Sequence, residues 1–119
     1  MCFVRISFLN PGVFKVNNIF ADIPGQMPEE LFTTLLQHKN LKIERIVSRG
    51  HANAGEEWYE QDHDEWVLLV QGEAILELAE QRQLIKLHAG DYLLIPAYRK
   101  HRVEWTKPEI DNIWLAIHF

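Results

Sequence analysis

From residue 41 onward, the sequence is a close succession of short apolar segments separated by turn residues. Glycine and proline mark several of these turns, among them Gly72, Gly90, Pro96 and Pro108. Many short strands at such spacing are typical of a sandwich, a jelly roll or a small barrel. No long helical segment separates them, which excludes a doubly wound parallel sheet. The sequence therefore predicts an all-β fold, with strands over residues 41–49, 56–59, 66–70, 74–78, 84–87, 92–95, 101–105 and 113–119.

One segment before residue 41 has a helical pattern instead. Pro28 suits the first turn of a helix, and the two glutamates that follow it suit the positive end of the helix dipole. Leu31, Leu35 and Leu36 then fall on one apolar stripe. The sequence therefore predicts a helix over residues 28–38, packed on the outside of the sheet.

Length and composition indicate a single domain. The chain has 119 residues, 47% of them hydrophobic, which predicts one globular domain over residues 1–119 with a barrel over residues 41–119. We expect residues 1–12 to be mobile. The only cysteine, Cys2, cannot form an internal disulfide. No segment approaches the roughly 20 apolar residues of a membrane span, so we expect a cytoplasmic protein with no membrane partner.

The charge balance disfavours a nucleic-acid partner. The formal net charge is −5, whereas nucleic-acid binders normally present a basic face. The one dense basic cluster consists of Arg99, Lys100 and Arg102. This cluster is either a solvated rim or a clamp for an anionic small ligand.

Several enzyme classes lack their residues in this chain. It has only two serines, Ser7 and Ser48, and neither stands in the sequence context of a hydrolase nucleophile. Its glycines form no phosphate-binding or dinucleotide-binding loop. A zinc site built from paired cysteines is impossible with one cysteine. The chemistry that remains is that of His, Glu, Asp and Gln within a β fold.

Two spaced motifs offer such chemistry. In the first, Glu65 is followed by six residues and Gly72; in the second, Gly90 is followed by five residues, Pro96, four residues and His101. These spacings resemble the two motifs of the cupin family, specifically its small single-domain, conserved-barrel members. The resemblance implies a cupin-type double-stranded β-helix, or jelly-roll barrel. It also implies that Glu65 and His101 bind a divalent metal ion inside the barrel, of unknown identity (Zn, Mn, Ni or Fe).

The resemblance is incomplete at the histidine pair that normally precedes the motif glutamate. Tyr59 and Gln61 stand in those places, or Trp58 and Glu60 if the gap is one residue longer. The chain thus resembles a subgroup of small cupins with Tyr-x-Gln in place of His-x-His. Gln61 is the expected third ligand, weaker than imidazole, so we expect weak metal binding. The competing interpretation makes the motif glutamate a surface residue at a strand end and the motif histidine a hydrogen-bonded core residue.

Side-chain alternation along the strands suggests further members of the site. Val67 shares a strand face with the motif glutamate, and Trp105 shares one with the motif histidine, so both are expected in the pocket together with Tyr98. Tyr59 and His51 are the candidates for proton transfer, because general acid–base work needs a titratable group within reach of the substrate. Two other histidines, at positions 63 and 118, are open candidates to join the site.

Three functions fit these features. The first is a metal-dependent enzyme, an oxygenase or an isomerase, acting on a small organic substrate. The second is a binding module that holds a sugar or a carboxylate without turnover, and the third is a dimeric structural protein. The cupin resemblance also implies a homodimer, in which a strand over residues 13–20 could add to the sheet edge of a partner.

Overall fold

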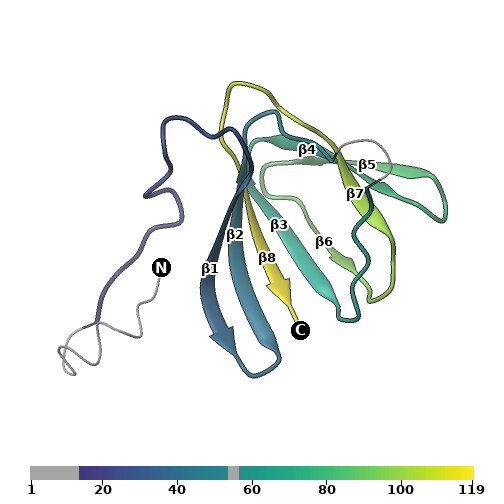
Figure 1. Ribbon diagram of the computed structural model, residues 1–119, viewed down its shortest axis with the longest axis horizontal. Coiled ribbons are helices and arrows are strands. Elements are labelled where there is room, and N and C mark those ends of the chain that lie inside the picture. Colours follow the sequence, from purple (N-terminus) through teal and green to yellow (C-terminus); the bar gives the residue numbers. More distant parts are fainter. Residues whose placement is uncertain (1–13, 54–56) are drawn as a thin grey trace.

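A computed structural model describes residues 14–53 and 57–119 of the chain, and these residues fold into eight strands without any helix (Figure 1). All strand pairs are antiparallel. The strands are β1 (Leu31–His38), β2 (Leu41–Ser48), β3 (Glu65–Gln71), β4 (Glu73–Leu78), β5 (Gln83–His88), β6 (Tyr92–Ile95), β7 (His101–Thr106) and β8 (Asn112–His118).

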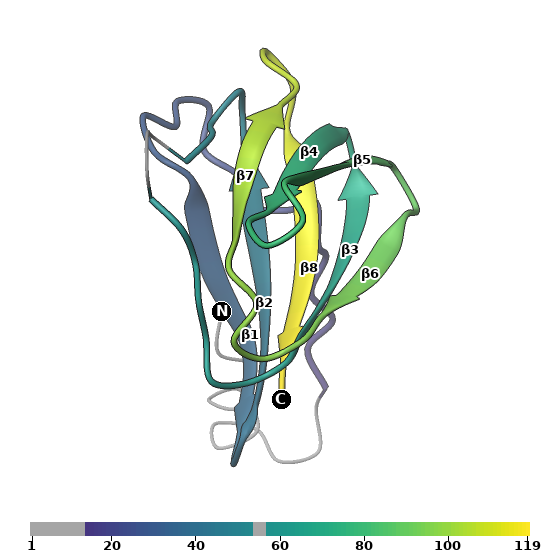
Figure 2. The ribbon, with the colours of Figure 1, turned by 90° about the vertical axis from the view of Figure 1, so that its right-hand side faces the viewer.

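The strands form two sheets that pack face to face. The larger sheet has the order β1-β2-β8-β3-β6, and the smaller one has the order β5-β4-β7. Figure 2 shows the smaller sheet lying across one face of the larger sheet. Non-consecutive neighbours such as β8 and β3 show that the chain crosses repeatedly between the two sheets, as a jelly roll requires. The predicted all-β, cupin-type fold is confirmed.

The core lies between the sheets and is built mainly by the central strands of each. Its residues alternate along the strands, so every second side chain points inward. The predicted strands from residue 66 onward are present with bounds that differ by at most one residue, and the same holds for residues 41–49. The core cluster consists of Val67, Leu69, Ala74, Leu76, Leu87, Ile95, Trp114 and Ala116.

The predicted helix over residues 28–38 is wrong, because residues 31–38 form strand β1. This strand pairs with β2 from Leu31, opposite Val47, to the far end of both strands. The register shifts between Thr34 and Leu36, so Leu35 is an extra residue in a β-bulge. The bulge interrupts the two-residue alternation and leaves apolar residues at positions 31, 35 and 36, a spacing that imitates a helical stripe.

Two other predicted strands are not formed as expected. Residues 14–20 form no strand, and residue 13 lies outside the described residues, as do residues 1–12. Of the predicted strand over residues 56–59, residue 56 lies outside the described residues, and among residues 57–59 only Tyr59 pairs, in a single bridge with His101. No helix in the described part of the chain is long and apolar enough to cross a membrane.

Candidate functional site

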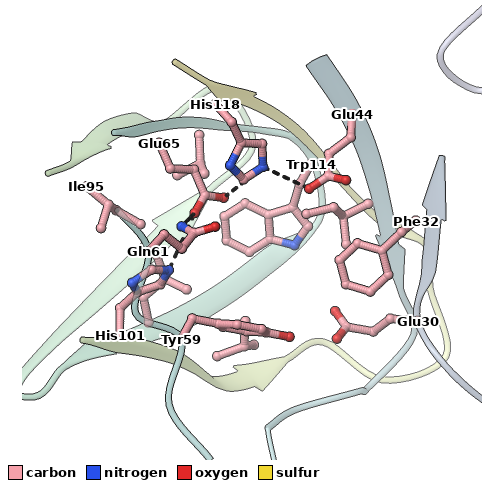
Figure 3. Close-up of a pocket in the computed structure, with 14 residues that line it drawn as sticks. Glu30, Phe32, Glu44, Tyr59, Gln61, Glu65, Ile95, His101, Trp114 and His118 are labelled. Atoms are coloured by element: carbon pink, nitrogen blue, oxygen red, sulfur yellow. Dashed lines mark hydrogen bonds and ion pairs between the residues drawn. The ribbon is translucent and has the colours of Figure 1, made fainter. Parts of the chain in front are cut away.

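A cavity of about 100 Å³ lies between the two sheets and opens beside β1 (Figure 3). Strands of both sheets contribute to its wall, and its inner part is apolar. Its polar side chains form two groups, with Glu65, Gln61 and His101 on one side of Trp114 and Glu30 and Glu44 on the other. The lining residues are Glu30, Phe32, Glu44, Ile46, Tyr59, Gln61, Glu65, Val67, Leu76, Ile95, His101, Val103, Trp114 and His118.

Strand alternation and register place the polar residues together. Glu65 begins β3 and lies on the same face as the buried Val67. It pairs across the sheet with His118 of β8, whose face also carries Trp114. The first residue of β7, His101, reaches the same end of the cavity from the smaller sheet. Two motif residues far apart in the sequence therefore meet inside the fold.

Glu65 and His101 form a buried ion pair. The Nε2 atom of His101 lies 3.5 Å from Oε1 of Glu65, and the two side chains are only 7% and 10% exposed. The other ring nitrogen, Nδ1, lies 2.9 Å from the carbonyl oxygen of Arg99, which assigns the proton on that nitrogen. The side-chain amide of Gln61 donates to Oε1 of Glu65 at 2.8 Å. Both ends of the pair are thus fixed by neighbouring groups.

These contacts set the charges of the pair. Burial acts to raise the pKa of Glu65, but the hydrogen bonds from His101 and Gln61 outweigh it and hold that pKa below its usual value. Burial acts to lower the pKa of His101, but the contacts with Glu65 and the Arg99 carbonyl outweigh it and raise that pKa. The two pKa shifts have opposite directions, and each favours the charged form of its own group.

His118, an open candidate in the sequence, lies between two carboxylates of the cavity. Its Nε2 atom is 2.9 Å from Oε1 of Glu44 and 4.0 Å from Oε2 of Glu65 (Figure 3). Its Nδ1 atom lies 3.0 Å from Nε2 of His63, which is on the outer side of the site. Burial acts to raise the pKa of Glu44, but the hydrogen bonds from His118 and Lys42 outweigh it and lower that pKa.

Two acidic residues that line the cavity, Glu30 and Glu44, were not expected from the sequence. Glu44 follows the same alternation that places Ile46 in the cavity, so its position could have been read from the strand pattern. Glu30 could not, because the segment before β1 was assigned to a helix. Phe32, which also lines the cavity, was missed for the same reason.

The structure brings several predicted site residues to the cavity. Gln61 and Val67 line it together with the motif pair. Tyr59 lies at its opening, 41% exposed, with its ring centroid 5.8 Å from that of His101. The backbone of Tyr59 also bonds the backbone of His101 in both directions, at 2.8 and 3.0 Å. This bridge holds the tyrosine next to the ion pair.

Three other predicted residues, Trp105, Tyr98 and His51, do not line the cavity. A register shift pairs Trp105 with Ile75 and Val103 with Leu76, so Trp105 points away from the cavity face that Val103 and Leu76 share. Tyr98 is 65% exposed and lies at a separate shallow depression of the surface.

His51, a predicted proton-transfer residue, has a structural role in this fold. Its Nδ1 atom accepts a hydrogen bond from the backbone N–H of Arg49 at 2.8 Å. Its Nε2 atom lies 3.1 Å from the carbonyl oxygen of Met27. Both ring nitrogens are therefore engaged outside the cavity lining, Nδ1 with the backbone after β2 and Nε2 with the loop before β1.

The cavity offers few donors for a metal ion. Among the described residues, no three His, Cys, Asp or Glu side chains converge on one point as a metal site requires. Glu65 and His101 supply two good donors, and the amide oxygen of Gln61 is a weaker third. The bond from Nδ1 of His101 to a carbonyl oxygen is the outer contact that metal-binding histidines usually make. Glu65 and His101, with Gln61 as a weaker third donor, are therefore the residues that would hold a divalent ion.

The two antiparallel sheets around a cavity lined by polar and apolar side chains define a jelly-roll fold. A family model described as a cupin domain matches residues 46–118, so the chain belongs to the cupin family. No curated protein matches the sequence.

Solved structures agree with this assignment. A Ralstonia eutropha JMP134 protein, called a "putative mannose-6-phosphate isomerase", is 43% identical; the match covers 87% of this chain and 96% of that one, with a TM-score of 0.83. A cupin superfamily protein from Desulfitobacterium hafniense DCB-2 is 24% identical over 82% of this chain and 83% of its own, with a TM-score of 0.68. An RmlC-like cupin from Shewanella frigidimarina NCIMB 400 is 18% identical over 82% of this chain and 78% of its own, with a TM-score of 0.63.

Proposed function

We propose that the protein binds a small organic molecule in this cavity and isomerises it by proton transfers that Glu65 and His101 make to and from the substrate. The observation that carries the proposal is the buried pair itself, in which the carboxyl group of Glu65 and the imidazole of His101 face the same cavity 3.5 Å apart. Groups whose surroundings push their pKa values in opposite directions are suited to act as base and acid. The Ralstonia protein at 43% identity supports the reaction class through its name.

The pair can carry out both halves of such a reaction. The Glu65 carboxylate takes a proton from a carbon next to a carbonyl group, and the His101 imidazolium gives its Nε2 proton to the carbonyl oxygen. The product of this step is an enediol or enol, and the reverse transfers at the neighbouring atoms complete the isomerisation. Tyr59 lies at the opening and can exchange a proton with the substrate at its outer end. The apolar inner wall limits access of water to the intermediate.

A weak divalent-metal site at the same residues is the second candidate. It is favoured by the orientation of His101, whose Nδ1 contact with Arg99 leaves Nε2 directed at Glu65. Glu65, His101 and Gln61 would hold the ion. A bound ion would supply Lewis-acid polarisation of a substrate carbonyl.

Deuterium exchange tests the proton-transfer proposal. We expect the wild type to catalyse uptake of solvent deuterium at the carbon next to the carbonyl in a panel of small hydroxycarbonyl compounds, measured by NMR. Glu65→Gln and His101→Gln should each reduce the rate by about 100-fold or more, because each removes one proton-transfer group. Tyr98→Phe, which changes a residue outside the cavity, is the matched control and should keep the rate. Saturable binding without exchange would leave a binding module and contradict catalysis.

Elemental analysis separates the two candidates. Tag-free wild type and His101→Ala are incubated with zinc, manganese, nickel and iron salts, and the metal content is measured after dialysis. Metal retained by the wild type and lost from His101→Ala would establish the metal site. Equal content in both proteins would refute it, while the deuterium-exchange result would stand by itself.

A further inference from the structure

The charged side chains that line the cavity are mainly acidic, which is unusual for a site that binds sugars or acids. Three carboxylates line it, those of Glu30, Glu44 and Glu65, and no lysine or arginine lines it among the residues that the structure describes. Glu65 is paired with His101, and Glu44 with both His118 and Lys42. Glu30 is the one lining carboxylate that has no ion pair in the described part of the chain. The cavity favours a ligand that brings positive charge.

Glu30 is the carboxylate without a partner. It lies half-buried at the opening, and in the described part of the chain it has neither a hydrogen bond nor an ion pair. Burial raises its pKa, and the nearby His51 offsets this only in part. A carboxylate taken partly out of water without a compensating group is costly. A cation at this position would remove that cost.

Aromatic rings surround the same end of the cavity. In Figure 3, the carboxylate of Glu30 lies beside Phe32, and the hydroxyl end of Tyr59 points toward it. The indole of Trp114 occupies the middle of the cavity, with Glu30 and Glu44 on one side and Glu65 on the other. Aromatic faces attract organic cations, and the attraction grows when water is excluded. Carboxylates and aromatic faces together form a recognition site for an ammonium group.

The basic cluster at residues 99–102 does not supply an anion site in the cavity. Arg102 is paired with Glu77 at 2.9 Å and lies 4.4 Å over the ring of Trp58. Arg99 lies 4.0 Å from Glu80. Neither arginine belongs to the cavity lining, so a phosphate in the cavity would meet carboxylates with no guanidinium to offset them.

We propose that the cavity selects a small organic cation, a short-chain amine in its ammonium form, with the ammonium group between Glu30 and Glu44 and its carbon chain over Trp114. The proposal rests on the proposed function in one respect, that this cavity is the ligand site. The cation proposal also predicts that the cavity rejects sugar phosphates, although the Ralstonia protein is named after mannose 6-phosphate. The cavity of about 100 Å³ limits the ligand to a few carbon atoms.

Ligands of matched shape and different charge test this inference. Butylammonium, butanol, butyrate and glycerol phosphate are titrated into the full chain, and the indole N–H signal of Trp114 is followed by NMR. We expect saturable shifts with butylammonium, weaker ones with butanol, and none with the two anions. Glu30→Gln should weaken ammonium binding by about tenfold, because it removes a charged hydrogen-bond partner. Glu29→Gln, one residue away and outside the lining, is the matched control and should bind as the wild type does.

The outcomes distinguish the inference from the function on which it rests. Saturation by butyrate or glycerol phosphate, with no response to the ammonium, would overturn the cation proposal and leave the cavity established as a ligand site. Equal ammonium affinity in Glu30→Gln and wild type would also overturn it. If no probe of any charge shifts Trp114, both the cation proposal and the small-molecule function fail.

Discussion

At the turn between β3 and β4, Gly72 adopts a backbone φ of +103° directly against Asn112. Asn112 cannot move away, because it is fully buried and its amide holds three parts of the chain together. Its Oδ1 atom accepts from the N–H of Glu73 at 3.0 Å, and its Nδ2 atom donates to the carbonyls of Ser48 and Lys107 at 3.0 and 2.8 Å. The first cupin motif therefore ends in glycine for a steric reason, since a side chain at position 72 would overlap Asn112.

We therefore expect Gly72→Ala to destabilise the protein by more than about 3 kcal/mol, since it combines a strained φ with overlap of buried atoms. Gly90→Ala is the matched control. Gly90 also has a positive φ, of +95°, but an added Cβ would meet nothing within 4 Å. Strain alone should cost Gly90→Ala about 1–2 kcal/mol. Urea unfolding of the wild type, Gly72→Ala and Gly90→Ala measures the free energies of unfolding. An equal loss of stability in the two variants would contradict the steric explanation.

Individual site residues could be predicted from the sequence where a motif linked residue type to position. Glu65 and His101 followed from motif spacing, and the buried pair agrees with that placement. Trp105 was misplaced because a bulge reverses the inward and outward faces, and no residue in the strand signals a bulge. Glu44 and His118 meet only through the pairing of β2, β8 and β3, which the sequence does not reveal.

Among the elements, β1 and β2 are the pair that most depends on the chain before them. Arg45 of β2 is 5% exposed and reaches out of the sheet to the preceding segment. Its Nη1 atom donates to the carbonyls of Ile19 and Ala21 at 3.1 and 2.5 Å. These bonds hold residues 19–22 against the outer face of the two strands. Strand β1, which includes two β-branched threonines, was predicted as a helix because its pairing with β2 and its bulge depend on residues outside the segment.

We expect Arg45→Leu to release residues 19–22 from the sheet, since the carbonyls lose a charged donor. The amide of Ala21, which donates to the carbonyl of Asn18 at 3.1 Å, should lose hydrogen-exchange protection by about tenfold or more. Global stability should fall by about 1–3 kcal/mol. Arg82→Leu is the control, because the side chain of Arg82 is 84% exposed. It should leave the exchange protection of Ala21 and the global stability unchanged. Unaltered exchange at Ala21 in Arg45→Leu would show that other contacts hold the segment.

For the whole molecule, strand alternation predicted the architecture well because strands β2 to β8 all contribute side chains to the core cluster or pack against it. The same rule explains how a jelly roll accommodates a polar end in its cavity. Glu65, His101 and His118 occupy inward positions at strand ends, where the two sheets separate and the core cluster no longer fills the space. The price is electrostatic, since inward carboxylates must be offset by neighbours. Glu65 is offset by His101, and Glu44 by His118 and Lys42, whereas His51 offsets Glu30 only in part.

This imbalance predicts a pH dependence of global stability that can be assigned to one residue. The pKa of Glu30 is raised above its ordinary value of 4.5 in the folded chain, first because of burial. Below pH 4.5 the group is largely protonated in both states and has little effect. As the pH rises, the unfolded chain releases this proton more readily, so the contribution of Glu30 to stability becomes unfavourable and then stays constant.

Glu30→Gln should therefore be more stable than the wild type near pH 7.5, and the difference should shrink toward zero near pH 4.5. Urea midpoints of both proteins at the two pH values measure it. Glu29→Gln is the control: the carboxylate of Glu29 is exposed, so the stability difference between this variant and the wild type should not change with pH. A Glu30→Gln protein that is less stable than the wild type near pH 7.5 would mean that the folded chain offsets this carboxylate after all. A gain in stability combined with a loss of ammonium binding would identify Glu30 as a residue kept for its ligand at the expense of the fold.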